Sequence, residues 1–226
     1  SGQLGNNSVA SSNIPVQVLG LGGSDFLTET IAIAAGENFS LALRSDGTVL
    51  AWGNNDGGQL GNGTTVGSLV PLQVVGAGGS GFLENIGAIS AGDGFATALS
   101  SDGMVWSWGK NNFGQLGDGT LIDKSFPVQV LDSAGVGSLN NISKIATGSS
   151  HALTLKSDGT GMMYAWGLND EGQLGINDLT NKSLPNQVKD LGGAGLFANV
   201  MDISAKAKQS MAIKNDKSPW VWGANN

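Results

Sequence analysis

Residues 35–61 read AGENFSLALRSDGTVLAWGNNDGGQLG, and this stretch decides the fold. Two short apolar runs, residues 39–44 and 48–52, flank a Ser-Asp-Gly at residues 45–47. An Asp-Gly between two apolar runs is a strong β-hairpin signal, and its usual form is a type I′ turn with positive φ at both central residues. Both runs are apolar on their two alternating faces, which is typical of a sheet covered on both sides. The stretch therefore predicts antiparallel strands packed between two other sheets.

The same pattern occurs four times along the 226 residues. Gly-Gln-Leu-Gly begins at Gly2, Gly58, Gly114 and Gly172, and Trp-Gly begins at Trp52, Trp108, Trp166 and Trp222. The Gly-Gln-Leu-Gly copies are 56, 56 and 58 residues apart, and joining the two ends of the chain would make the fourth spacing 56. The chain thus holds a whole number of repeats, roughly 2–57, 58–113, 114–171 and 172–226 plus residue 1, in a single domain over 1–226.

The pattern at residues 35–61 resembles the regulator-of-chromosome-condensation (RCC1-like) repeat family, and the resemblance covers the whole chain. It implies an all-β fold, a β-propeller of four-stranded blades, usually seven per ring. Residues 1–226 would then form either a single small β-propeller or a segment of a larger one. Residues 14–19 would then complete the blade whose other strands lie at residues 201–222, as a split blade joining the N- and C-termini. The Gly-Gly-Ser-Gly-Phe-Leu loop at residues 78–83 is similar to loops of bacterial exported or surface members, which implies an extracellular or cell-surface location.

Composition excludes several classes of function. The net charge is −7 and the 11 lysines and arginines are scattered, so the chain lacks the basic patch that nucleic-acid binding needs. Cysteine is absent, which removes disulfides and thiolate chemistry. No apolar run approaches the roughly 20 residues of a membrane helix, so we predict no membrane insertion. No segment carries a sustained 3.6-residue period, which predicts little or no helix. The missing signal peptide and initiating Met suggest a processed product or a fragment.

The residues that could carry chemistry are better explained as parts of the repeat. Asp46, Asp102 and Asp158 occupy hairpin turns, which favour Asp for its local hydrogen bonds. The glutamine of each Gly-Gln-Leu-Gly is expected to satisfy backbone groups. Carboxylates near these loops could in principle hold calcium, but their spacing matches no known calcium loop. We therefore predict no catalytic residue, no metal site, no cofactor and no enzymatic activity.

One position differs between the repeats where the family tends to have His. It precedes the Ser-Leu-Ala-Leu strand of each repeat and is occupied by Phe39, Phe95, His151 and Gln209. We predict that these four residues lie on one face of the ring and form the partner-binding site of a non-catalytic scaffold, because exposed aromatic residues are frequent hot spots.

Two alternatives remain open from the sequence. A cut inside a blade would allow one chain to accept a strand from another, so a structural self-assembly module, a ring or filament completed between chains, is the first alternative. Regulation of a small GTPase, in the manner of a guanine-nucleotide exchange factor, is less favoured. It needs an inserted wedge loop, and the near-constant repeat lengths leave room for only two extra residues, around residues 161–162.

Overall fold

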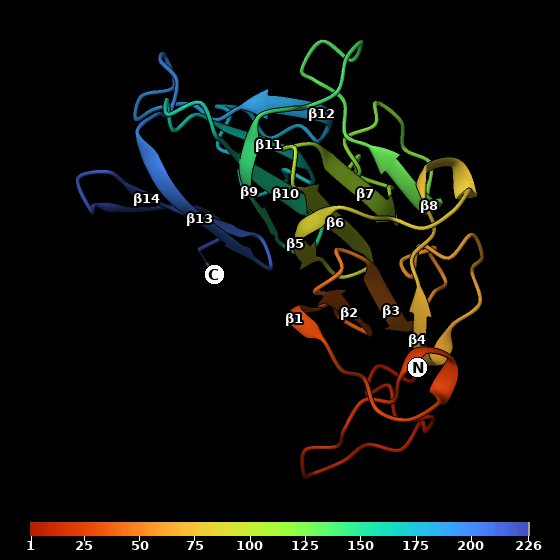
Figure 1. The fold of residues 1–226 in the computed structure, drawn as a ribbon. Coiled ribbons are helices and arrows are strands. Elements are labelled where there is room, and N and C mark those ends of the chain that lie inside the picture. The colour runs from red at the N-terminus through yellow and green to blue at the C-terminus, as the bar shows by residue number, and fades with distance from the viewer. Residues whose placement is uncertain (226) are drawn as a thin grey trace.

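The structure, a computed structural model that describes residues 1–225, is built from antiparallel β-sheets arranged as four blades (Figure 1). Blade 1 contains β1 (Thr30–Ala35), β2 (Phe39–Arg44), β3 (Val49–Gly53) and β4 (Ser68–Gln73). Blade 2 contains β5 (Ile86–Ala91), β6 (Phe95–Ser100), β7 (Val105–Gly109) and β8 (Lys124–Gln129). Blade 3 contains β9 (Ile142–Thr147), β10 (His151–Lys156), β11 (Met163–Gly167) and β12 (Lys182–Gln187), and blade 4 contains β13 (Val200–Lys206), β14 (Gln209–Lys214) and β15 (Pro219–Gly223). The helical segments of the described chain are two three-residue turns, η1 (Leu21–Gly23) and η2 (Ala77–Gly79). The predicted all-β propeller with little helix is confirmed.

The Ser-Asp-Gly segments connect the second and third strands of blades 1 to 3, as the sequence predicts. The predicted type I′ turn is wrong, however, because only the glycine has positive φ, 79° at Gly47. The Gly47 amide donates to the Arg44 carbonyl at 3.0 Å, and the Asp46 carboxylate accepts from the Thr48 amide at 3.0 Å. A type I turn followed by one left-handed residue fits this pattern. The aspartate therefore serves as an acceptor inside the turn.

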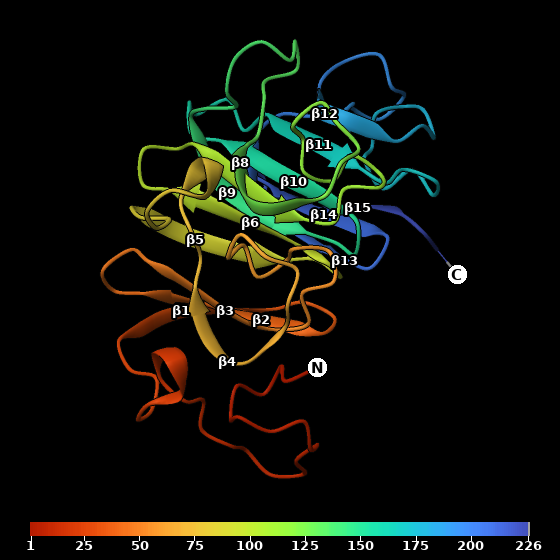
Figure 2. The same ribbon diagram turned by 90° about the vertical axis from the view of Figure 1, so that its right-hand side faces the viewer.

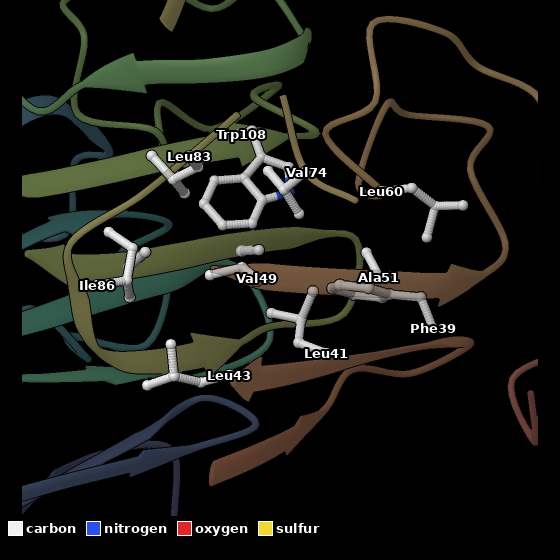
Figure 3. Packing of buried hydrophobic residues seen from close by; sticks show 12 residues of the cluster. Phe39, Leu41, Leu43, Val49, Ala51, Leu60, Val74, Leu83, Ile86 and Trp108 are labelled. Carbon is white, nitrogen blue, oxygen red and sulfur yellow. The ribbon is translucent and has the colours of Figure 1, made fainter. Parts of the chain in front are cut away.

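The hydrophobic core lies between neighbouring blades. Figure 3 shows the cluster in which Leu41 and Leu43 of β2, with Val49 of β3, pack against blade 2. Trp108 of β7 is fully buried in this cluster. A buried aromatic side chain of this kind removes about 150–250 Å² of surface from water. Equivalent clusters lie between blades 2 and 3 and between blades 3 and 4, so each blade is stabilised mainly by its neighbours.

The Gly-Gln-Leu-Gly loops join each blade to the next. The Gln59 side chain accepts a hydrogen bond from the Gly57 amide at 2.9 Å, and Gln115 and Gln173 make the same bond to the residues two before them. This confirms that the repeated glutamine satisfies backbone groups. Gly61 has φ of 61°, and a Cβ built on it would lie 2.8 Å from the Trp108 indole of the next blade. Only glycine allows the loop to approach that tryptophan so closely.

The four blades form an open arc. The inner strands β1, β5, β9 and β13 contact one another in that order (Figure 1), and the N- and C-terminal segments extend beyond blade 1 and blade 4 respectively (Figure 2). The split blade predicted from the sequence is absent from residues 1–225, where β15 pairs only with β14. Residues 14–19 instead stay with blade 1, where Val18 packs against a cluster that includes Leu50 and Trp52. No helix in the described residues has the length and apolar character needed to cross a membrane.

Candidate functional site

The four residues predicted to contact a partner occupy the first position of the second strand in each blade. Their side chains do not form an exposed ring. Phe39, Phe95 and His151 are buried, with 0–1% of their surface exposed, and only Gln209 is exposed. Three of the four are therefore unable to touch a partner on the folded surface, contrary to expectation. A role in partner binding stays a prediction, as a direct contact for Gln209 and as a support for the others.

The buried rings lie beneath the turn between the first two strands of each blade. A Cβ built on Gly36 would lie 2.0 Å from the Phe39 ring and 2.7 Å from the Gly92 carbonyl oxygen. The glycine of the repeated Ala-Gly pair therefore allows the turn to lie directly over the ring, because a side chain at this position would collide with it. In blade 4, Lys206 takes the place of the glycine, and Gln209 is exposed, donating to the Ala224 carbonyl at 2.8 Å. Sequence reasoning missed this coupling, although the joint change at both positions of the fourth repeat was a visible signal.

His151 occupies this supporting position in blade 3. Its Nε2 lies 2.9 Å from Ser210 Oγ, which itself donates to the Gln173 carbonyl at 2.7 Å. Ser210 must then accept from His151, so Nε2 carries the proton. The buried Nδ1 has no hydrogen-bond partner among the described residues. Burial lowers the pKa of His151 to about 4. A neutral ring without an acidic neighbour has a packing role here, and this geometry gives it no partner for acid–base chemistry.

The turns above these rings surround a cavity of about 430 Å³ at the centre of the arc. All four inner strands line it, and its mouth carries Glu37, Asp93, Ser149 and Ala207 at equivalent turn positions. Backbone hydrogen bonds join neighbouring turns, from the Asp93 amide to the Ser149 carbonyl at 2.9 Å and from the Ser149 amide to the Ala207 carbonyl at 2.8 Å. These bonds link the turns of blades 2, 3 and 4, and the displayed side chain changes from blade to blade. The turn of blade 4 differs in its backbone, because Ala207 has φ of 49°.

Exposed aliphatic side chains project from the loops that begin at the same face. Each loop starts beside a turn, as shown by the Asn54 amide, which donates to the Asn38 carbonyl at 2.8 Å. The exposed aliphatic residues of these loops, between 61% and 72% exposed, are Val66, Leu121, Ile122 and Leu179. These residues lie outside the repeat motif, so the motif alone does not predict them. An aliphatic residue in a loop, outside any predicted strand, is the sequence feature that indicates such an exposed apolar side chain.

Carboxylates near the Gly-Gln-Leu-Gly loops form contacts within the chain. Among residues 1–225 no group of three His, Asp or Glu side chains is placed to hold a metal ion. Asp170, near the Gly-Gln-Leu-Gly loop of blade 3, instead forms an ion pair with Lys208, and this hydrogen bond lowers the pKa of its carboxyl. Asp118 likewise accepts from the Asn111 side chain at 3.1 Å. These carboxylates hold the loops together.

Known proteins share the repeat across the whole chain. The model of the RCC1-like domain matches residues 1–226. The chain is 30% identical over 224 residues to the ultraviolet-B receptor UVR8 of Arabidopsis thaliana, covering 99% of this chain and 47% of the receptor. It is 28% identical to the human E3 ubiquitin-protein ligase HERC2, covering all of this chain but 4% of the ligase. It therefore spans about half of the receptor and a small part of the ligase.

Solved structures show the same fold. Human WBSCR16 matches with a TM-score of 0.69 and 23% identity, over 86% of this chain and 47% of that one. The yeast RCC1 protein Prp20, crystallised in complex with Kap60, matches with a TM-score of 0.67 and 24% identity, over 86% of this chain and 43% of Prp20. A second structure of Prp20 from Saccharomyces cerevisiae, whose description refers to binding of Gsp1p and histones, matches with a TM-score of 0.65 and 26% identity, covering 86% and 45% of the two chains.

Proposed function

Because the chain belongs to the RCC1-like domain family, we propose that it is a non-catalytic β-propeller scaffold that binds a protein partner through the face carrying the inner turns. The observation that supports this most is the row of turns at the mouth of the central cavity. Four turns at repeat-equivalent positions display Glu37, Asp93, Ser149 and Ala207. A rigid frame with variable side chains is the arrangement that partner recognition uses on other scaffolds.

The chemistry of this face favours a partner with both basic and apolar groups. Glu37 and Asp93 are exposed neighbours at the mouth of the cavity, in blades 1 and 2. Exposed aliphatic side chains, among them Val66 and Ile122, begin from the same face and would add apolar contact area. Carboxylates steer a basic partner into place, and apolar side chains then supply the affinity. The acidic balance of the chain makes nucleic acid a poor candidate.

The relatives are consistent with a binding role. One is named as a receptor, and the Prp20 structures concern its contacts with other proteins. The ligase name belongs to a protein of which this chain covers 4%, so we assign no ligase activity to the repeat. Regulation of a GTPase stays the less favoured alternative. An extracellular or cell-surface location and a bacterial exported type remain expectations from the loop at residues 78–83.

Charge reversal on the two faces would test the proposal. The double variant Glu37→Lys/Asp93→Lys changes the face of the turns. The matched control, Glu29→Lys/Glu84→Lys, makes the same change in net charge at exposed residues preceding β1 and β5, at the opposite face. Both variants and the parent would be immobilised and incubated with extract of the source organism, and bound proteins quantified by mass spectrometry. We expect a partner retained by parent and control but lost by the first variant. A partner lost equally with both variants, or with neither, would contradict this site.

A further inference from the structure

The contact between blades 2 and 3 differs in its chemistry from the contacts on either side of it. Between blades 1 and 2, repeated positions on the facing strands carry aliphatic side chains such as Leu41 and Ala51, which Figure 3 shows within their cluster. Between blades 2 and 3, five of these positions carry a side-chain hydroxyl instead. We call this set the hydroxyl seam, and it consists of Ser90, Thr97 and Ser107 of blade 2 and Thr147 and Thr154 of blade 3.

The replacement is complete at these five positions. Repeat spacing gives the counterpart of each member in the other two contacts. Between blades 1 and 2 the counterparts all belong to the apolar cluster, and they are Ala34, Leu41, Ala51, Ala91 and Ala98. Between blades 3 and 4 they again belong to the apolar cluster, and they are Ala146, Leu153, Ala165, Ala205 and Ala212. At these positions a polar contact therefore lies between two apolar ones.

Two hydroxyls of the hydroxyl seam are buried without a hydrogen bond. Thr97 is 1% exposed and Thr154 is 0% exposed, and the Oγ1 of neither has a partner among residues 1–225. A hydroxyl that leaves water without gaining a new partner destabilises the contact. When blades 2 and 3 separate, both hydroxyls return to water, whereas Leu41 and Leu153 would expose apolar surface if their contacts separated. Separation is therefore less unfavourable at the hydroxyl seam.

The other members of the hydroxyl seam form local hydrogen bonds. The Ser90 and Thr147 hydroxyl oxygens lie 2.7 Å apart across it, and the Ser107 hydroxyl donates to a carbonyl of its own blade at 2.6 Å. No ion pair of the described chain crosses the hydroxyl seam, whereas Lys144 and Asp202 form one between blades 3 and 4 at 2.6 Å. The hydroxyl seam thus has neither the aliphatic packing of blades 1 and 2 nor the ion pairing of blades 3 and 4.

We propose that the hydroxyl seam is the place where the chain opens, with blades 1 and 2 moving as one body and blades 3 and 4 as the other. The apolar contacts within each body would stay closed. Opening would break the bond from the Asp93 amide to the Ser149 carbonyl, which joins the inner turns of blades 2 and 3 at 2.9 Å. The turns at Glu37 and Asp93 would then shift relative to those at Ser149 and Ala207, without the unfolding of any blade.

Three backbone amides report the three contacts in matched surroundings. Each is buried, belongs to a β-branched residue, follows an asparagine and donates across its contact to a glycine carbonyl. They are the amides of Ile86, Ile142 and Val200, whose hydrogen bonds to Gly47, Gly103 and Gly161 measure 3.1, 3.1 and 3.2 Å. Because these surroundings are alike, differences in protection from hydrogen exchange report how often each contact opens.

Hydrogen exchange of the 226-residue chain, followed by NMR under native conditions, tests the proposal. We expect the Ile142 amide to exchange roughly tenfold or more faster than the amides of Ile86 and Val200, because the two unpaired hydroxyls favour the open form of its contact. An Ile142 amide that exchanges no faster than either of the other two would overturn the proposal.

Exchanging side chains between the contacts tests the cause. Thr97→Leu/Thr154→Ala gives the hydroxyl seam the side chains of its neighbours, and it should slow exchange at Ile142 roughly tenfold or more while leaving Ile86 unchanged. The reverse variant, Leu41→Thr/Ala98→Thr, should instead accelerate exchange at Ile86. If the reverse variant fails to fold, the first variant decides alone. Equal slowing at Ile142 and Ile86 in the first variant would show a general gain in stability and contradict opening at the hydroxyl seam.

A disulfide across the hydroxyl seam tests whether the blades separate as bodies. The chain has no cysteine, and the close Ser90 and Thr147 oxygens mark where two sulfur atoms would meet in Ser90→Cys/Thr147→Cys. In the oxidised form we expect exchange at Ile142 to be suppressed, with Ile86 unaffected, and reduction should restore it in the same sample. Unchanged exchange at Ile142 with the disulfide closed would assign it to a local fluctuation and overturn the movement of two bodies.

Discussion

The indole Nε1 of Trp108 donates a hydrogen bond of 2.9 Å to the main-chain carbonyl of Gln59, 49 residues earlier in the chain. The same bond joins Trp52 to Gln3, Trp166 to Gln115 and Trp222 to Gln173. Each tryptophan therefore anchors its blade to the loop that leaves the preceding one. This explains why Trp-Gly and Gly-Gln-Leu-Gly recur with the same period. The tryptophan supplies the indole N–H donor. The Gly-Gln-Leu-Gly loop supplies the glutamine carbonyl that accepts it and a glycine that allows the indole to pack closely.

Removing the indole N–H donor should destabilise the fold more where the tryptophan ring is more deeply buried. Trp108→Phe removes the N–H and leaves the buried Gln59 carbonyl unpaired, so we expect a loss of about 2–4 kcal/mol in the free energy of unfolding. Trp222→Phe breaks the same bond to Gln173 where the ring is only partly buried, and should cost clearly less. Urea denaturation followed by circular dichroism would measure both. Equal losses would show that burial does not set the strength of this bond.

The glycine at the inner turn should be intolerant of any side chain. Gly36→Ala would place its Cβ 2.0 Å from the Phe39 ring, so ring or turn must shift, at an expected cost of about 1–3 kcal/mol. Gly87 offers a control within β5, because a Cβ there meets nothing closer than 3.6 Å. Gly87→Ala should change stability by no more than about 0.5 kcal/mol. Melting temperatures of the two variants compare them directly, and a tolerated Gly36→Ala would refute the supporting role of the Phe39 ring.

The sequence predicts the strands and hairpins of each blade better than it predicts which side chains are exposed at the inner turns. Strands and hairpins follow from local signals, such as Asp46-Gly47 between two apolar runs, and the repeat spacing shows how many blades there are. Which side chain at a turn is exposed depends on contacts that no local pattern shows. Phe39 looked like a surface aromatic because it follows a polar turn, yet Gly36 lets that turn lie over its ring. The open arc likewise depends on the angle between packed sheets, which repeat spacing does not specify.

The hairpin of blade 4 contains a strained residue that can be relieved. Lys217 has φ of 70° where blades 1 to 3 have glycine, and a non-glycine residue in the left-handed region costs roughly 1–2 kcal/mol. Lys217→Gly should raise the free energy of unfolding by about 0.5–1 kcal/mol, after allowing for the added flexibility of the unfolded chain. Lys217→Ala removes the same charge but keeps the strain, so it should give no gain. Thermal denaturation would separate the two, and a stabilised alanine variant would attribute the gain to charge.

The buried imidazole should make folding sensitive to acid. Above pH 6.5 His151 is neutral in both the folded and the unfolded chain. Below that pH the unfolded chain binds a proton, whereas the folded chain does not until about pH 4, because burial lowers the pKa of His151. The free energy of unfolding should therefore fall as pH drops from 6.5 to about 4, by at most about 3 kcal/mol.

His151→Phe, which copies Phe39 and Phe95 at the same position, should remove this part of the pH dependence. Denaturant titrations of both proteins at pH 7 and pH 4.5 would measure it. Parallel losses of stability in the two proteins would place the acid sensitivity elsewhere, in carboxylates such as Asp170 that are paired in the folded state.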